Sequence, residues 1–293
     1  MSVLSQFVFN GIVAGSVYAL IALGFALIFT ASRVFHFAHG GVYTVSAFAG
    51  YTVMVTLGLG LAAGFATAAL VAALMGVGIN MVLYEPMKAG NVSPFVAMIS
   101  SFGVLIILTN LTAIVWGSNP TVLSPGGSAT IYRLGPIYTT GPQLQIIVFT
   151  VVLALLLWVF FRFVRLGIAI RAMGSDAELA EVVGMPSRRL RHISFIVGSG
   201  LVGISSLLIG LNVGIIDFNM GFDIMLMATV AMIIGGLGNV GAAAAGGFVL
   251  GVVQNVAIWK IESKWQLAIS FGILILMLLF RPSGLFGERG PAA

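Results

Sequence analysis

The alternation of apolar and polar positions divides the chain into long charge-free stretches separated by short polar segments. These stretches lie at about 8–31, 41–57, 61–83, 94–116, 143–161, 193–213, 224–259 and 265–280. Most of them have the roughly 20 residues that a helix needs to cross a lipid bilayer. The pattern predicts an all-α protein, a polytopic bundle of transmembrane helices that forms a single domain over residues 1–293.

The stretch at 224–259 is too long for one ordinary span. Its middle is the glycine-rich segment Gly235-Gly236-Leu237-Gly238-Asn239-Val240-Gly241. This segment predicts two short helices with a break between them, which gives about nine spans in all. The count is eight if the stretch is one long kinked or re-entrant element.

The composition excludes a water-soluble protein. The chain is 60% hydrophobic and 7% charged, whereas roughly a quarter of the residues of a soluble domain are charged. Too few charged side chains are present to cover a soluble surface, so soluble enzymes are excluded. Because there is no cysteine, disulfides, thiolate metal sites and cysteine nucleophiles are excluded as well.

The charges predict an orientation. Thirteen Lys and Arg against eight Asp and Glu give a net charge of +5, and in membrane proteins excess Lys and Arg gather in cytoplasmic loops. A nucleic-acid partner is therefore not needed to explain the excess of basic residues. Placing the arginine-rich loop 162–192 inside puts the N-terminus outside and the C-terminus inside. The Pro-, Gly- and Ser-rich segment 117–142 is then the main external loop.

Glycines supply two further patterns. Four pairs have the G-x-x-x-G spacing that lets helices approach closely in lipid: Gly11 and Gly15, Gly60 and Gly64, Gly210 and Gly214, and Gly247 and Gly251. In addition, Phe37-x-x-Gly40 and Phe218-x-x-Gly221 each follow one long apolar stretch and precede another. In the predicted orientation they lie on opposite faces of the membrane, which indicates an inverted repeat. In transporters such repeats commonly surround the translocation path.

Residues that could carry chemistry are few. His36 and His39 could share a helical face, but no third metal ligand lies near them in sequence, so we predict no metal site and interpret them as a polar break between helices. Such a break is tolerated at membrane depth only against protein or a cavity. Asp217 and Asp223 are expected at an external edge, and we expect no charge deep within a span. The candidate path or break residues are His36, Phe37, His39, Gly40, Gly235, Gly236 and Gly238.

Neither nucleotide motif is usable. The residues from Gly236 to Gly241 satisfy G-x-G-x-x-G, but apolar spans flank them instead of a βαβ unit. A P-loop sequence, G-x-x-x-x-G-K-[ST], does not occur. The chain is therefore predicted to bind no ATP and no other cofactor.

A short helix is predicted within the long basic loop, at about 176–183. Ser175 and Glu178 have the spacing of a capping box, and Gly184 and Pro186 end the helix. The helix is too short to span, and its apolar residues predict that it docks into a partner. The alternative is an interfacial helix that lies on anionic lipid.

Several segments together resemble the branched-chain amino acid permease family of ABC importers. Glu178-Leu179-Ala180-x-x-x-Gly184 is similar to the E-A-A-x-x-x-G coupling loop of ABC permeases, although Leu179 replaces the first alanine. The other landmarks run in family order over most of the chain: Gly15 to Gly24, Phe37 to Gly40, Gly235 to Asn239 with Gly246-Gly247, and Arg281 to Gly287.

The resemblance implies a permease of the bacterial inner membrane that imports branched-chain or other hydrophobic amino acids. It implies four kinds of partner: a second homologous permease, identical or not, two cytoplasmic ABC ATPases that use ATP and Mg²⁺, an extracytoplasmic solute-binding protein, and the lipid bilayer. The implied ATPase-coupling residues are Ser175, Glu178, Ala180 and Gly184.

Three alternatives stay open. A permease for urea or short amides would have the same uncharged path. A secondary carrier or channel would work alone and use an ion gradient. An intramembrane enzyme would need a polar catalytic cluster, which the sequence does not show.

Overall fold

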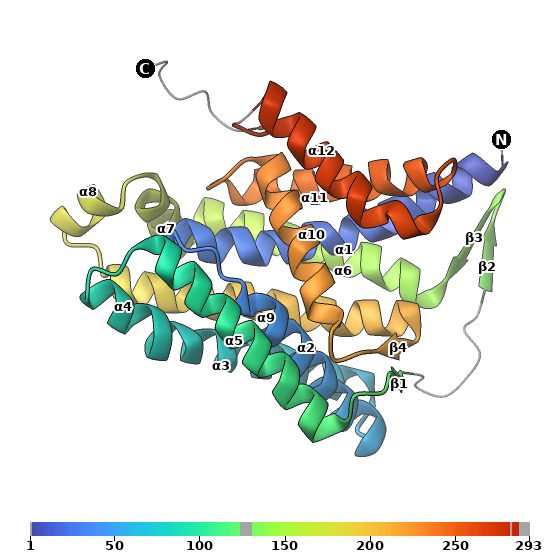
Figure 1. Ribbon diagram of the computed structural model, residues 1–293, viewed down its shortest axis with the longest axis horizontal. Coiled ribbons are helices and arrows are strands. Elements are labelled where there is room, and N and C mark those ends of the chain that lie inside the picture. The colour runs from blue at the N-terminus through green and yellow to red at the C-terminus, as the bar shows by residue number, and fades with distance from the viewer. Residues whose placement is uncertain (1, 124–130, 282, 287–293) are drawn as a thin grey trace.

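A computed structural model of the protein describes residues 2–123, 131–281 and 283–286. It is a bundle of helices, most of which run along one axis (Figure 1). The predicted all-α polytopic fold is confirmed. In chain order the elements are α1 (Ser2–Ser32), α2 (Ala38–Tyr51), η1 (Thr52–Thr56), α3 (Gly60–Ile79), η2 (Asn80–Tyr84), α4 (Glu85–Ala89), α5 (Pro94–Trp116), β1 (Thr121–Val122), β2 (Ile131–Leu134), β3 (Ile137–Thr140), α6 (Gly141–Phe163), α7 (Arg165–Ser175), α8 (Ala177–Val182), α9 (Ser187–Val213), β4 (Ile215–Ile216), α10 (Met220–Gly235), α11 (Val240–Ile258), η3 (Ser263–Trp265) and α12 (Gln266–Phe280).

By length and composition, 7 helices among the described residues can cross a membrane. They are α1, α3 with its continuation through α4, α5, α6, α9, α11 and α12. The apolar helix α10 is shorter, and α2 continues through the π-helical turn η1. The predicted break in 224–259 is confirmed: α10 ends at Gly235 and α11 begins at Val240. Gly236 and Gly238 have φ angles of 133° and 85°, which side chains disfavour, so the helix cannot continue through them.

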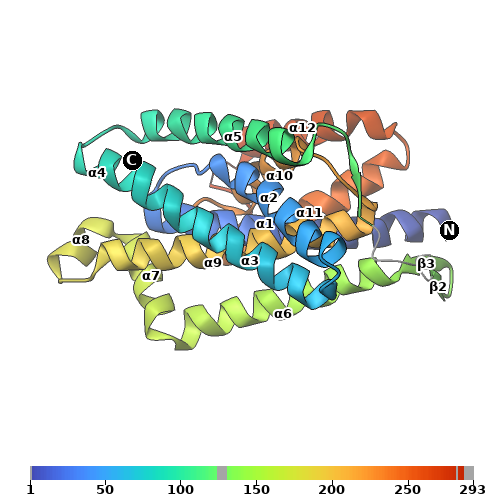
Figure 2. The ribbon, with the colours of Figure 1, turned by 90° about the horizontal axis from the view of Figure 1, so that it is seen from below.

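The two ends of the bundle differ. At one end lie α4, α7 and α8, and at the other lies the β2–β3 hairpin (Figures 1 and 2). We call these the α8 end and the hairpin end. Strands β1 and β4 pair antiparallel, with Thr121 opposite Ile216. The predicted external loop 117–142 thus contains β1 and the hairpin, and its residues 124–130 lie outside the described part.

Glycines bring α1 and α11 into backbone contact. A Cβ at Gly15 would lie 2.6 Å from the carbonyl oxygen of Phe248, and one at Gly251 would fall on the backbone of Gly15. The predicted packing role of Gly11, Gly15, Gly247 and Gly251 is confirmed. Gly60 and Gly214 do not pack in this way. Both have positive φ angles and no atom within 4 Å of an added Cβ, so they shape turns instead.

The packing has the pairing of helices that the predicted inverted repeat would give. Helix α1 packs on α11 and α10, while α9 packs on α3 and α2. Helix α1 is followed by Arg33 with φ 56°, and α9 by Gly214 with φ 81°. Arg33 contacts α7 at the α8 end, whereas Leu123 beside β1 bonds Gly214 at the hairpin end. The two halves therefore turn back into the bundle from opposite ends.

Helices α2 and α10 begin inside the bundle and meet there. After α1, Phe35 packs back on Phe29 with ring centroids 4.9 Å apart. A Cβ at Gly24 would lie 3.5 Å from Nε2 of His39. Because Gly24 precedes the end of α1 by eight residues, α2 starts about 12 Å inside that end. A Cβ at Gly40 would lie 2.5 Å from the carbonyl oxygen of Gly221, so the two helix starts are in direct contact.

The α1–α11 contact can be tested by substituting one of its glycines. We expect Gly251→Ala to destabilise the protein by about 1–3 kcal/mol, because the added methyl group cannot fit without moving α1. The measurement is the thermal midpoint of unfolding in detergent. Gly78→Ala is the matched control, because no atom lies within 4 Å of a Cβ there. Equal midpoints for the two variants would contradict the packing role.

Candidate functional site

The short helix α8 stands apart from the bundle at the α8 end (Figure 1). It covers Ala177–Val182, close to the predicted 176–183. The residue that caps it is Asp176, whose Oδ1 accepts a hydrogen bond of 2.9 Å from the backbone N–H of Leu179. The predicted capping box is therefore wrong: Ser175 ends α7, and its hydroxyl donates to the carbonyl of Arg171. Asp176 is the better cap because its extended backbone points the carboxylate at the free N–H groups.

Gly184 ends α8 as predicted. Its φ angle is 80°, and its N–H donates to the carbonyl of Glu181. The next N–H, of Met185, donates to the carbonyl of Ala180. This left-handed turn sends the chain from α8 into α9.

One side of α8 is anchored and the other is bare. Ala180 is buried, with 4% of its surface exposed, and belongs to the main core cluster. Leu179, Val182 and Val183 are 57%, 79% and 62% exposed. Leu179, the residue that departs from the coupling motif, is thus on the bare side. Large exposed apolar side chains grouped on one short helix mark an interaction surface.

Helix α7 connects α8 to the core helix α1. The Arg33 guanidinium, just after α1, donates to the carbonyl of Gly174 near the end of α7. Gly174 also fits against Thr30, because an added Cβ would fall on the Thr30 methyl group. These two contacts hold the end of α7, which leads into α8, against the end of α1.

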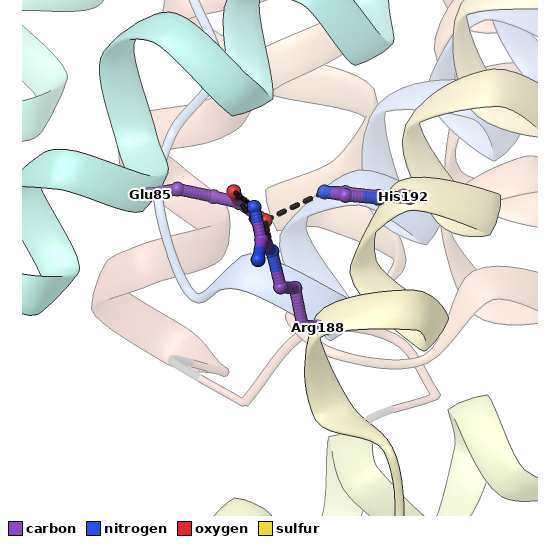
Figure 3. A network of polar contacts seen from close by, with 3 residues as sticks. All are labelled: Glu85, Arg188 and His192. Atoms are coloured by element: carbon purple, nitrogen blue, oxygen red, sulfur yellow. Dashed lines mark hydrogen bonds and ion pairs between the residues drawn. The ribbon is translucent and has the colours of Figure 1, made fainter.

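A second connection runs through a polar cluster between α4 and α9 (Figure 3). The Glu85 carboxylate accepts a bidentate interaction from Arg188, with Nη2 2.8 Å from Oε2 and Nε 3.0 Å from Oε1. His192 Nε2 lies 2.6 Å from Glu85 Oε1. Bidentate arginine–carboxylate pairs fix geometry as well as charge. The cluster joins the end of the α3–α4 helix to the start of α9.

A third connection joins α4 to α8 itself. Lys88 Nζ lies 3.1 Å from Glu181 Oε1. The hydrogen bond and charge of Lys88 lower the pKa of Glu181 below its ordinary value. Both side chains are more than half exposed, so the pair contributes little to stability. Its effect is to orient α8 relative to α4.

Sequence reasoning missed this arrangement. Arg188 and His192 are 103 and 107 positions from Glu85, so no local spacing reports the cluster. The available signal was weaker: polar residues at the ends of apolar spans that are expected on the same side of the membrane.

The predicted path residues His36 and His39 are buried in the bundle. His36 Nδ1 lies 2.7 Å from the Tyr84 hydroxyl in η2, and its ring packs on Phe195 of α9 at 5.2 Å between centroids. The break between α1 and α2 is confirmed. In this conformation the two imidazoles face the core, and their place on a translocation path stays a prediction.

The glycine-rich break between α10 and α11 is held from two sides. The Thr30 hydroxyl at the end of α1 donates to the carbonyl of Gly238 at 3.3 Å. After α12, Leu285 and Phe286 donate backbone hydrogen bonds to the carbonyls of Ile234 and Gly235. The break therefore lies at the same end as α7 and α8.

Comparison with known proteins identifies the family. A family described as "Branched-chain amino acid transport system / permease component" matches residues 7–278. The chain belongs to this family. It is 31% identical over 298 residues to the high-affinity branched-chain amino acid transport system permease protein LivH of Salmonella typhimurium, with 97% of this chain and 95% of LivH covered. It is also 31% identical over 291 residues to BraD of Pseudomonas aeruginosa, with 95% and 94% covered.

A solved structure shares the fold. PsaBC from Streptococcus pneumoniae in complex with Fab aligns with a TM-score of 0.53 at 13% sequence identity, covering 95% of this chain and 93% of that chain. The chain is thus a multi-pass permease subunit of an ABC importer, a transport component and not itself an ATPase.

The permease concentrates its basic residues at the α8 end. Arg33 follows α1 there, Arg165 and Arg171 lie in α7, and Arg188 and Arg191 lie in the first turns of α9. At the hairpin end, Arg133 lies in β2, and Lys260 and Lys264 lie in the turn between α11 and α12. The predicted grouping of charges is present, and the orientation that it implies stays a prediction.

The polar cluster can be tested by removing its acceptor. We expect Glu85→Gln to lower the free energy of unfolding by roughly 1–2 kcal/mol, because Arg188 and His192 lose an ionised partner that is 13% exposed. Chemical denaturation in detergent measures the effect. Glu262→Gln is the matched control, since Glu262 and its partner Lys264 are both exposed. A loss no larger than that of the control would show that the cluster is not a firm connection.

Proposed function

We propose that this permease imports branched-chain or other hydrophobic amino acids across the bacterial inner membrane, driven by separate ATPase subunits. The relatives LivH and BraD support the solute class, because both are named as permease proteins of branched-chain amino acid transport systems. The bare apolar side of α8 is the observation that carries the ATPase assignment. It is a docking surface that this chain leaves uncovered.

The proposed assembly has this permease and a second, homologous one side by side. Two cytoplasmic ABC ATPases bind at the α8 end, and an extracytoplasmic solute-binding protein binds at the hairpin end. The concentration of basic residues at the α8 end supports this orientation. ATP and Mg²⁺ are used by the ATPases, because this chain has no P-loop sequence.

Helix α8 is the proposed coupling helix. Glu178 lies in its first turn, Ala180 anchors it, Ser175 ends the helix that carries it, and Gly184 sets the angle at which the chain leaves it. Leu179, Val182 and Val183 would contact the ATPase. A partner can change the conformation of the permease only if it binds the two conformations with different affinity. The closed ATPase pair must therefore bind this surface more tightly in one permease conformation than in the other.

Motion at α8 would reach the spans through its three connections. Helix α7 acts on α1, Lys88 acts on α4, and the Glu85 cluster acts on α9. Beside them a cavity of about 150 Å³ is lined by Asn80, Tyr84 and Arg191, next to the π-helical turn η2. A π-helical turn beside empty space is a suitable place for α3 to move relative to α9.

Gly184 offers a test of the coupling helix. We expect Gly184→Leu to lower uptake per ATP hydrolysed about tenfold, because a side chain strains the left-handed turn by about 1–2 kcal/mol and reorients α8. The measurement compares uptake and ATP hydrolysis in proteoliposomes that contain the complete transporter. Gly135→Leu is the matched control, since Gly135 has φ 62° at the hairpin end. Full coupling in the Gly184 variant would refute the docking assignment.

The solute can be tested on the partner that selects it. We expect the solute-binding protein that works with this permease to bind leucine, isoleucine or valine in calorimetry and to release no heat with urea. Uptake by this chain alone, driven by an ion gradient, would instead establish a stand-alone carrier. Binding of urea or a short amide without amino acids would establish the amide permease.

A further inference from the structure

Helix α10 carries one charged residue, Asp223, in its first turn. The helix begins inside the bundle, where the N–H of Gly221 donates to the hydroxyl of Thr44 at 3.1 Å. Asp223 therefore lies two residues beyond the contact between the two helix starts. The sequence predicts that Asp223 lies at an external edge. This prediction is wrong, because α10 starts inside the bundle and not at the hairpin end.

The depth of Asp223 follows from its neighbour. The Phe222 ring packs on the Phe102 ring of α5, with centroids 6.2 Å apart. Phe102 lies eight residues after Pro94, where α5 begins, which places it about 12 Å along that helix. Fourteen further residues separate Phe102 from the other end at Trp116. Asp223 thus lies beside a part of α5, an apolar candidate span, that is far from both ends of that helix.

The carboxylate is exposed at this depth. Asp223 is exposed, and within the described residues it makes no ion pair and no side-chain hydrogen bond. The helices around it, α5, α10 and α12, form the near side of the molecule in Figure 1 and the upper side in Figure 2. An ionised side chain facing lipid is costly, so such residues face a partner or a polar path.

The surroundings of Asp223 are aromatic. Phe102 and Phe222 are 39% and 41% exposed, so both rings are partly open, and Phe222 is the direct chain neighbour of Asp223. Further along α5, the exposed amide of Asn110 also faces away from the bundle. A carboxylate binds an ammonium group by charge-assisted hydrogen bonds, and open aromatic rings beside it suit an apolar side chain and a cation.

We propose that Asp223 binds the ammonium group of the transported amino acid, in a path between this side of the permease and the second permease. Phe102 and Phe222 contact the solute's apolar side chain. The inference rests on the proposed function and extends it to a solute-contacting residue. It also separates the solute classes, because urea and short amides have no ammonium group for the carboxylate to bind.

The test uses the complete transporter in proteoliposomes and measures three quantities: leucine uptake, ATP hydrolysis stimulated by the loaded binding protein, and assembly of the complex by size exclusion. We expect Asp223→Asn to lower uptake at least tenfold, with stimulated hydrolysis within twofold of the unmodified transporter and assembly unchanged. Asp223→Glu, which keeps the charge, should restore part of the uptake.

Asp217→Asn is the matched control. Asp217 lies three residues before α10, and its carboxylate accepts a backbone hydrogen bond from Asn219, so uptake should not change. Normal leucine uptake by Asp223→Asn would overturn the inference and leave the proposed function intact. Loss of assembly in that variant would also overturn it, because Asp223 would then pair with a basic residue of the second permease. Uptake of urea and of no amino acid by the unmodified transporter would overturn both proposals.

Discussion

This structure depends on close packing between helix backbones. Lipid alone would not hold these helices together. Lipid is as apolar as the side chains, so burial of apolar surface does not drive helices together as it does in water. Glycines supply the alternative, because they let backbones approach until dispersion forces act over the whole contact. Helix α1, in the middle of the bundle, meets α11 at Gly15 and Gly251 and meets α9 where Gly24 faces Gly198.

Buried polar side chains attach the outer helices to this centre. The Tyr18 hydroxyl donates to Gln254 Oε1 at 3.0 Å, and the Gln254 amide donates to the Ser270 hydroxyl at 2.7 Å. These bonds join α1, α11 and α12 in a region without water, where an unpaired polar group is costly. They give α12, whose other side is largely exposed, one fixed rotation about its axis.

The two functional regions are separated along the helices. In the proposed function the ATPases act at α8, while the proposed solute contact, Asp223, is an exposed residue in the first turn of α10. The helices between them are continuous: α9 runs from the Glu85 cluster to the hairpin end, and α2, which packs on α9, meets α10 at Gly40 and Gly221. Rigid helices with discrete contacts at both ends can therefore carry a rearrangement from one region to the other.

By itself the sequence determined the helical bundle, the break at residues 236–239 and the short helix α8. These features depend on local causes: backbone groups in lipid must bond within their own helix, and glycine, proline and capping residues end helices where they stand. The sequence predicts Ser175 as the cap, but Asp176 caps the helix, because the backbone angle at Asp176 decides which oxygen reaches the N–H groups.

Only the tertiary structure decided what lies beside what. It brought Arg188 and His192 to Glu85, placed His36 and His39 in the core, and set Asp223 at mid-depth on an exposed side. The places of His36, His39 and Asp223 depend on where the chain turns back into the bundle after α1 and α9, at Arg33 and Gly214. That depth is fixed by contacts between helices distant in sequence, so no local pattern of residues can report it.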